Sequence, residues 1–274
     1  MSALALSERS AFALARVVAT HQSRDVMRKR WVLAYGLGLA ASGDMLLRLA
    51  GNGPSALVSL LNVVLLLVPL ISLVLGAAAL YGARDFTELL LAQPIPRRAL
   101  FLGLYLGLTL PLMAATVIGI ALPFAVERAI TADTGPTLLL MLLVSALLVG
   151  VFTALAFVVT VRVADRARGL GVAILTWLAM GVLYDGAVLA AATAFNAWPI
   201  ERPMLLAMLL NPIDLARTIL LLRLDVAALM GYTGAVFRLV FGSAAGPGLG
   251  LLALTVWLVV PLWLGARTFD RKDF

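Results

Sequence analysis

The sequence predicts an all-α membrane protein with six transmembrane helices, and three observations support this fold class. The 274 residues are 63% hydrophobic and 13% charged, with a mean hydropathy of +1.06, a composition typical of proteins that cross a membrane several times. The apolar residues form runs long enough to cross the ~30 Å hydrocarbon core of a bilayer as helices. Most basic residues lie between these runs, as the orientation of a membrane protein favours.

Several functional classes are excluded by what the sequence lacks. The net charge of +7 is spread between the apolar runs, so we expect no nucleic-acid partner. With no cysteine and a single histidine, His21, metalloproteases and Ser–His proteases lack their ligands and bases, and no metal site is expected. No phosphate-binding loop of the form G-x-x-x-x-G-K-[ST] is present, so the chain is not expected to be an enzyme that hydrolyses ATP by itself.

The first 30 residues are expected to form a cytoplasmic segment before a single transmembrane domain over residues 31–274. A polar and an apolar stripe follow helical spacing in this segment. The polar residues are Arg9, Arg16, Thr20, Arg24 and Arg28, and the apolar residues are Leu14, Val17 and Val18. Two interpretations remain open: an amphipathic helix on the inner membrane surface, or a solvated tail whose basic residues only set the orientation.

Six apolar runs are predicted to span the membrane, at about residues 31–49, 55–81, 99–126, 137–161, 169–197 and 248–265. Asp44 and Arg48 interrupt the first span near its outer end, four residues apart, where they can pair on one helix face or contribute to a pathway. Asp185 lies near the middle of the fifth span, where a carboxylate costs ~2.5–3.5 kcal/mol on insertion scales. It should therefore face protein or water, either as a pore-lining or gating group or in a structural hydrogen bond.

Prolines and charged residues interrupt residues 198–246 too often for another span. Asn211 followed by Pro212 is a favourable helix start, so we expect short, partly amphipathic helices at the outer surface and a turn at residues 231–235. Six spans place both termini inside, together with 15 of the 21 lysine and arginine residues. A seventh span at residues 204–224 would put the basic C-terminus outside, against the positive-inside rule.

A short charged segment, residues 81–98, separates the second and third spans. Phe86, Leu89 and Leu90 fall on one face of a helix of about two and a half turns, which the prolines at positions 94 and 96 end. A helix this short is not stable alone, so its apolar face needs lipid headgroups or another protein. The alternative is an ordinary loop helix with a solvated charged face.

This segment resembles the coupling helix of ABC-2-type transporter permeases. The match rests on Glu88-Leu89-Leu90, Gln93-Pro94 and Arg97, whereas Asp85-Phe86 stand where the family usually has Gly-Thr. The resemblance implies an interfacial elbow helix at the N-terminus and a coupling helix that docks into a separate cytoplasmic ATPase subunit. That subunit would bind ATP and Mg, and this chain would bind no cofactor. The expected coupling residues are Arg84, Asp85, Phe86, Glu88, Leu89, Leu90, Gln93, Pro94 and Arg97.

Other residues resemble one branch of this family, the NosY-like permeases that assist maturation of nitrous oxide reductase. They are residues 30–34, 210–214, 231–237 and 269–273. The branch implies a homodimer in the bacterial inner membrane that works with two ATPase subunits and a periplasmic β-helical protein in assembling a copper–sulfur cofactor. The candidate outer docking residues are then Asn211, Pro212, Asp214 and Tyr232. Two alternatives stay open: an ABC-2 exporter of lipid, drug or polysaccharide, and a membrane assembly factor with no transport cycle.

Overall fold

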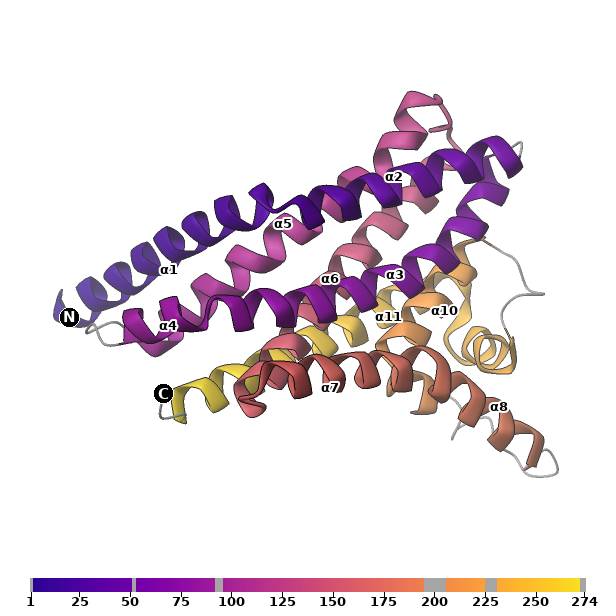
Figure 1. Cartoon of the computed structure of the whole chain (residues 1–274). Coiled ribbons are helices and arrows are strands. Elements are labelled where there is room, and N and C mark those ends of the chain that lie inside the picture. Colours follow the sequence, from indigo (N-terminus) through magenta and orange to yellow (C-terminus); the bar gives the residue numbers. More distant parts are fainter. Residues whose placement is uncertain (1, 51–52, 92–95, 195–205, 225–230, 272–274) are drawn as a thin grey trace.

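The computed structural model of this chain describes residues 2–50, 53–91, 96–194, 206–224 and 231–271, and these residues form helices and no strands (Figure 1). The helices are α1 (Ser2–Arg28), α2 (Arg30–Ala50), α3 (Gly53–Gly82), α4 (Arg84–Leu91), α5 (Arg97–Val126), α6 (Gly135–Arg162), α7 (Arg166–Leu178), the π-helical η1 (Ala179–Leu183), α8 (Tyr184–Ala194), α10 (Pro212–Leu224) and α11 (Gly231–Arg271).

Six of these segments are long and apolar enough to cross a membrane, which confirms the predicted fold class. They are Arg30–Ala50, Gly53–Gly82, Arg97–Val126, Gly135–Arg162, Arg166–Ala191 and Gly248–Arg271. Both ends of the chain and α4 lie at the same end of the bundle (Figure 1), which we call the terminal end. An even number of crossings requires this arrangement, so the six predicted spans and the observed fold agree.

The centre of the bundle is formed by α5 and α6, which pack against α2, α3 and α11. Phe101 of α5 meets Phe157 of α6 edge to face, with ring centroids 5.0 Å apart. Lipid tails are as apolar as leucine, so helices in a membrane associate through close packing rather than through the hydrophobic effect. Glycines make that packing possible: a Cβ added to Gly119 of α5 would lie 2.8 Å from the carbonyl oxygen of Gly36 in α2.

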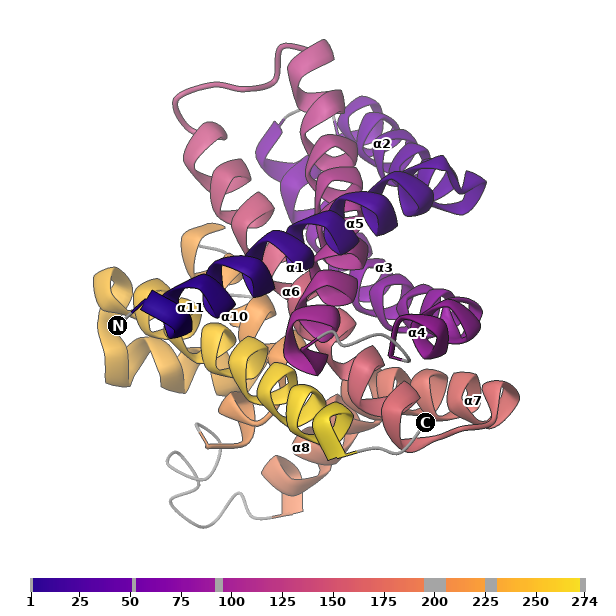
Figure 2. The ribbon, with the colours of Figure 1, turned by 90° about the vertical axis from the view of Figure 1, so that its left-hand side faces the viewer.

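α1 packs along the first half of α5 and crosses it at the terminal end (Figure 2). A Cβ added to Gly103 would lie 2.8 Å from the Cβ of Val18, and one added to Gly107 would lie 2.5 Å from the Cβ of Gln22. Among residues 13–28 of α1, the buried ones are Ala15, Val18, Ala19, Gln22 and Val26. Val17, which was expected on the apolar face, is 61% exposed. The N-terminal helix is therefore present, with Val18 buried as expected and Val17 exposed, and its place at the membrane surface stays a prediction.

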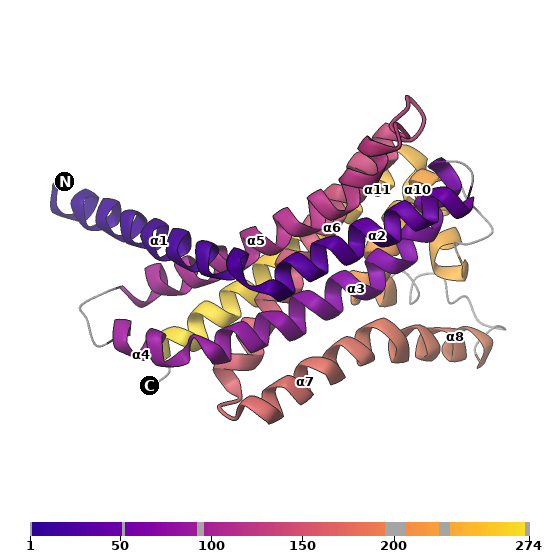
Figure 3. The same ribbon diagram turned by 45° about the horizontal axis from the view of Figure 1, so that its top comes forward.

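The fifth span departs from a regular α-helix. It consists of α7, η1 and α8, and the π-helical turn of η1 lies between two regular α-helical segments, as such turns often do at functional sites. Figure 3 shows α7 and α8 along the outside of the bundle. Only 6% of the most apolar stretch of this span is buried, so it is the span held least by apolar packing within the chain.

Two expectations for the region before the last span are wrong. α11 begins at Gly231 and continues without a break through the last span, so residues 231–235 form no turn. α10 begins at Pro212 as expected, but it is not a surface helix, because most of its residues are buried between α3, α6, η1 and α11. Asp214 and Arg217 of this helix form ion pairs inside the protein, and Ile219 packs directly against Gly250 of α11.

Candidate functional site

α4 connects the second and third spans at the terminal end and corresponds to the predicted coupling helix. Thr87 holds its first turn, because the amide and the hydroxyl of Thr87 both donate to the carbonyl oxygen of Ala83, at 2.9 and 2.8 Å. Arg84 and Glu88 form an ion pair one turn apart, with 3.0 Å between Nε and Oε1. The helix over residues 84–91 is therefore confirmed.

The apolar side chains of α4 point in two directions. Phe86 is 48% exposed and Leu89 is 70% exposed, whereas Thr87 is buried and Leu90 packs against the core of the bundle. The single apolar face expected for Phe86, Leu89 and Leu90 is therefore divided into one side chain that anchors the helix and two that remain exposed. Two exposed apolar side chains beside an ion pair are suited to contact with another protein.

α4 is attached to the loop between α6 and α7. Arg84 donates from Nη1 to the carbonyl oxygen of Ala164 at 3.0 Å, and the hydroxyl of Tyr81 donates to the carbonyl oxygen of Val163 at 2.7 Å. The Tyr81 ring also lies so close to Gly169 of α7 that a Cβ would not fit there. Sequence analysis missed this junction because its two halves are about 80 positions apart. Both segments are basic, so the sequence predicted that they lie on the same side of the membrane, but it did not predict that they touch.

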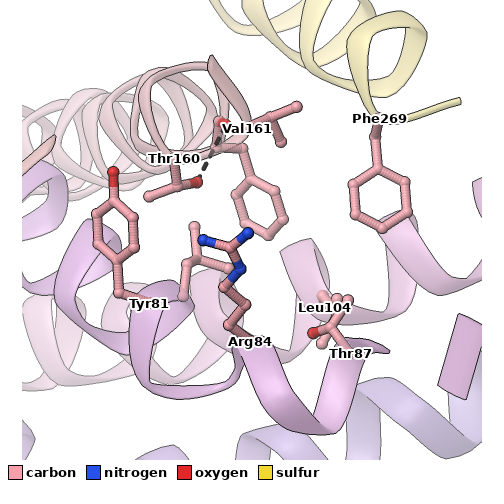
Figure 4. Close-up of a pocket in the computed structure, with 9 residues that line it drawn as sticks. Tyr81, Arg84, Thr87, Leu104, Thr160, Val161 and Phe269 are labelled. Carbon is pink, nitrogen blue, oxygen red and sulfur yellow. Dashed lines mark hydrogen bonds between the residues drawn. The ribbon is translucent and has the colours of Figure 1, made fainter. Parts of the chain in front are cut away.

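A small cavity of about 50 Å³ lies beside α4 (Figure 4). Its lining residues come from α3, α4, α5, α6 and α11, and they are Leu80, Tyr81, Arg84, Thr87, Leu104, Phe157, Thr160, Val161 and Phe269. The Phe269 ring packs on Phe101 at 5.7 Å between centroids, which ties the last span to this site. Residues of four other helices therefore face the same cavity as α4.

The start of α5 is attached to the end of α11. Arg97 donates from Nη1 to the carbonyl oxygen of Asp270 at 3.1 Å, and Arg98 pairs through Nε with the Asp270 carboxylate at 2.8 Å. Sequence analysis named Arg97 as a coupling residue but did not predict the contacts of Arg97 and Arg98 with Asp270. Of the remaining predicted coupling residues, Gln93 and Pro94 lie outside the described residues. The side chain of Asp85 also lies outside the described part of the chain.

At the opposite end of the bundle, Asp44 and Arg48 form the pair expected from their spacing. Arg48 contacts the Asp44 carboxylate through two nitrogens, at 3.0 and 3.1 Å, and contacts Glu127 at 3.1 Å. The cluster joins the end of α2 to the end of α5. All three side chains are exposed, so the arrangement favours the structural interpretation over a role in a pathway, and such pairs contribute little to stability.

Asp185 meets α10 beside the π-helical turn. Arg217 of α10 contacts Asp185 at 2.5 Å and Asp214 at 3.6 Å, and Asn211 donates from Nδ2 to the carbonyl oxygen of Met180 at 2.7 Å. The pKa of Asp214 is raised to about 6, mainly by burial; Arg217 opposes this shift and Asp185 adds to it. Asp185 thus faces protein, and polar contacts attach α10 to the fifth span.

Three of the four predicted outer docking residues are inside the protein. Asn211, Pro212 and Asp214 are buried, because α10 inserts between other helices and its polar groups bind within the chain. In this conformation they cannot form a docking surface for another protein. Tyr232 lies in α11, and its side chain is outside the described part of the structure.

The six spans and the anchored helix between the second and third spans define a polytopic membrane protein with a short helix at its terminal end that exposes Phe86 and Leu89. The chain belongs to the ABC-2 family of transporter proteins, which matches residues 21–274. It is similar to a protein of Pseudomonas aeruginosa called "Probable ABC transporter permease protein NosY", with 31% identity over 268 residues, 91% of this chain and 93% of that protein. A protein of the same description from Stutzerimonas stutzeri is 30% identical over 273 residues, 90% of this chain and 92% of the relative. The predicted family, an ABC-2 permease of the NosY type, is confirmed.

Proposed function

We propose that this chain is the membrane subunit of an ATP-driven complex and that α4 is the site where a separate cytoplasmic ATPase docks. The observation that carries the proposal is the exposure of Phe86 and Leu89 on a helix whose other side is fixed to the bundle. The terminal end then faces the cytoplasm, which agrees with the basic residues gathered there. ATP and Mg are bound by the partner, and two copies of the chain form the membrane part of the complex.

The contacts of α4 explain how a partner's motion would enter the membrane domain. Arg84 binds both Glu88 within α4 and Ala164 of the next loop, and Tyr81 fixes the end of α3 to the same loop. A push on α4 therefore moves α3 and the start of α7 together rather than bending a loose connection. α7 begins the span with the least apolar packing, which makes it the element most easily moved.

The similarity to NosY proteins supports a more specific role. We propose that the complex serves maturation of nitrous oxide reductase by assisting assembly of its copper–sulfur cofactor, together with a periplasmic β-helical partner. Because α10 is buried, this partner would dock on neighbouring outer segments, including the start of α11 with Tyr232, rather than on Asn211 or Asp214. An exporter of lipid, drug or polysaccharide and a non-transporting assembly factor share the same architecture.

The test uses the full-length chain expressed with its ATPase. The double variant Phe86→Asp/Leu89→Asp removes two contacts that each stabilise an interface by ~1.5–3 kcal/mol when fully buried, so affinity for the ATPase should fall by about a hundredfold or more. The control Phe86→Leu/Leu89→Met keeps the apolar character and should retain the ATPase. Co-purification and stimulated ATP hydrolysis are measured for both. Normal ATPase binding by the acidic variant would refute the docking assignment.

The proteins that co-purify from native membranes separate the finer alternatives. An ATPase together with a periplasmic repeat protein supports the maturation complex. An ATPase without an outer protein favours an exporter, and the absence of any ATPase favours the assembly factor. Sidedness is tested in the same preparation, because the natural chain has no cysteine and a single cysteine at Glu88 should react with an impermeant maleimide only from the cytoplasmic side.

A further inference from the structure

An apolar groove of about 220 Å³ runs between α2 and α5 on the outside of the bundle. Gly36 and Ala115 bring the two helices together there, since a Cβ on Gly36 would be 3.5 Å from the carbonyl oxygen of Ala115. Leu33, Leu37 and Ile118 line the groove and are each more than half exposed. The groove is therefore open toward the membrane and not filled by the chain's own side chains.

One end of this groove meets a basic pocket through a shared residue, Met27. The pocket lies on the last two turns of α1 and is lined by His21, Arg24, Asp25, Met27 and Arg28. Asp25 is paired with Lys29 at 3.3 Å. Arg24 and Arg28 are exposed, and within the described part of the chain neither forms an ion pair. The pocket thus carries two positive charges that no described acidic side chain pairs with.

The length of α2 places the pocket at the membrane boundary. Its 21 residues span about 31 Å at ~1.5 Å per residue, which matches the ~30 Å hydrocarbon core. Arg28, Lys29 and Arg30 then lie at one boundary and Arg48 at the other. The basic pocket is at the depth of lipid headgroups, and the groove that starts at Met27 is at the depth of acyl chains.

We propose that the groove and the pocket together bind one anionic phospholipid, with its phosphate on Arg24 and Arg28 and an acyl chain along α2 and α5. Basic side chains near a membrane attract anionic lipids, and guanidinium groups bind phosphate through paired hydrogen bonds. A second copy of the chain fits this surface less well. Two copies in one membrane are related by an axis along the membrane normal, so their like-charged pockets would meet at the same depth.

The experiment measures retained lipid on the full-length chain in mild detergent by native mass spectrometry, after exposure to dioleoyl phosphatidylglycerol or dioleoyl phosphatidylcholine. The natural chain should retain the anionic lipid preferentially. Arg24→Gln/Arg28→Gln should lower its retention by about 25-fold, since each basic residue near a surface contributes about fivefold, and should lower retention of the zwitterionic lipid much less. The matched control Arg166→Gln/Arg168→Gln removes two exposed arginines at the same end of the bundle and should retain the lipid.

Two further variants test the groove itself. Ala40→Phe adds bulk to a lining residue without changing charge and should lower retention of both lipids, with size-exclusion profile and Tm confirming that the variant is folded. Unchanged lipid retention in Ala40→Phe or in Arg24→Gln/Arg28→Gln overturns the proposal. A single Leu37→Cys in the cysteine-free chain reports on a second copy: rapid disulfide formation between copies in native membranes would show that protein fills the groove and would also overturn it.

Discussion

Replacing Gly107 by alanine should loosen α1 from α5. A Cβ at this position would lie 2.5 Å from the Cβ of Gln22 and 3.0 Å from the carbonyl oxygen of Ala19, whereas ordinary contact begins at about 3.4 Å. The second of these neighbours is backbone, so rotating a side chain cannot relieve the clash. The whole of α1 must move outward by several tenths of an ångström or more.

The magnitude follows from the cost of overpacking, ~1–3 kcal/mol for an added methyl group in a well-packed site. Alanine also has a higher helix propensity than glycine. Because α5 is helical whether α1 is attached or not, this gain is the same in both states and does not change the equilibrium between attached and detached α1. The detached population of α1 should therefore rise by about 5- to 150-fold, at ~1.4 kcal/mol per factor of ten.

Limited trypsin digestion measures this population, because α1 carries several exposed arginines that are protected while the helix is docked. When reclosing is fast, the cleavage rate follows the population of the open state, so Gly107→Ala should release N-terminal peptides at least about fivefold faster. Gly38→Ala is the matched control, since a Cβ on Gly38 has no other atom within 4 Å. Equal cleavage rates in Gly107→Ala and the natural chain would refute the packing argument.

Two further predictions concern charged residues at the opposite end from α4. Arg217→Ala leaves Asp185 and Asp214 without their cation and should lower the free energy of unfolding by ~1–3 kcal/mol, a range reduced because the ion pair is about one-third exposed. Thermal unfolding measures this loss. The control Arg48→Ala, in an exposed cluster, should leave Tm unchanged. The folded-state pKa of Asp214 is about 6 against 3.8 for the free side chain, so the folded protein binds more protons between pH 4 and pH 6. Its Tm should fall as pH rises through that window, and Asp214→Asn should remove this dependence.

Patterns along the sequence were sufficient for elements that depend on neighbours close in the chain. Runs of apolar residues predicted all six spans, and the turn signals around Pro94 and Pro96 predicted a helix that the structure confirms over 84–91. The spacing of Asp44 and Arg48 predicted their pairing. In each case the interaction that stabilises the element is with lipid or with a residue a few positions away. Composition and periodicity are therefore sufficient to predict the element.

The same reasoning failed where distant segments compete for one place. α10 contains charged residues and looked like a surface helix, but Arg217 pairs with Asp185 across 32 positions and with Asp214, and most of the helix is buried. The turn expected at Gly231 is absent because α11 continues through it. A charged residue in a sequence pattern predicts an exposed position, and a glycine predicts a break in a helix. Neither prediction can include a partner that only the folded chain brings close.

Sequence alone therefore determined the membrane class, the number of crossings and the family segment between the second and third spans, because hydrophobic length and local turn chemistry are properties of contiguous residues. Only the tertiary structure decided which side chains of α4 are free and which are anchored. It joined Arg84 to Ala164 and Arg98 to Asp270, and it brought α1 against the glycines of α5. These contacts depend on the relative positions of helices, which are set by close packing across the whole bundle.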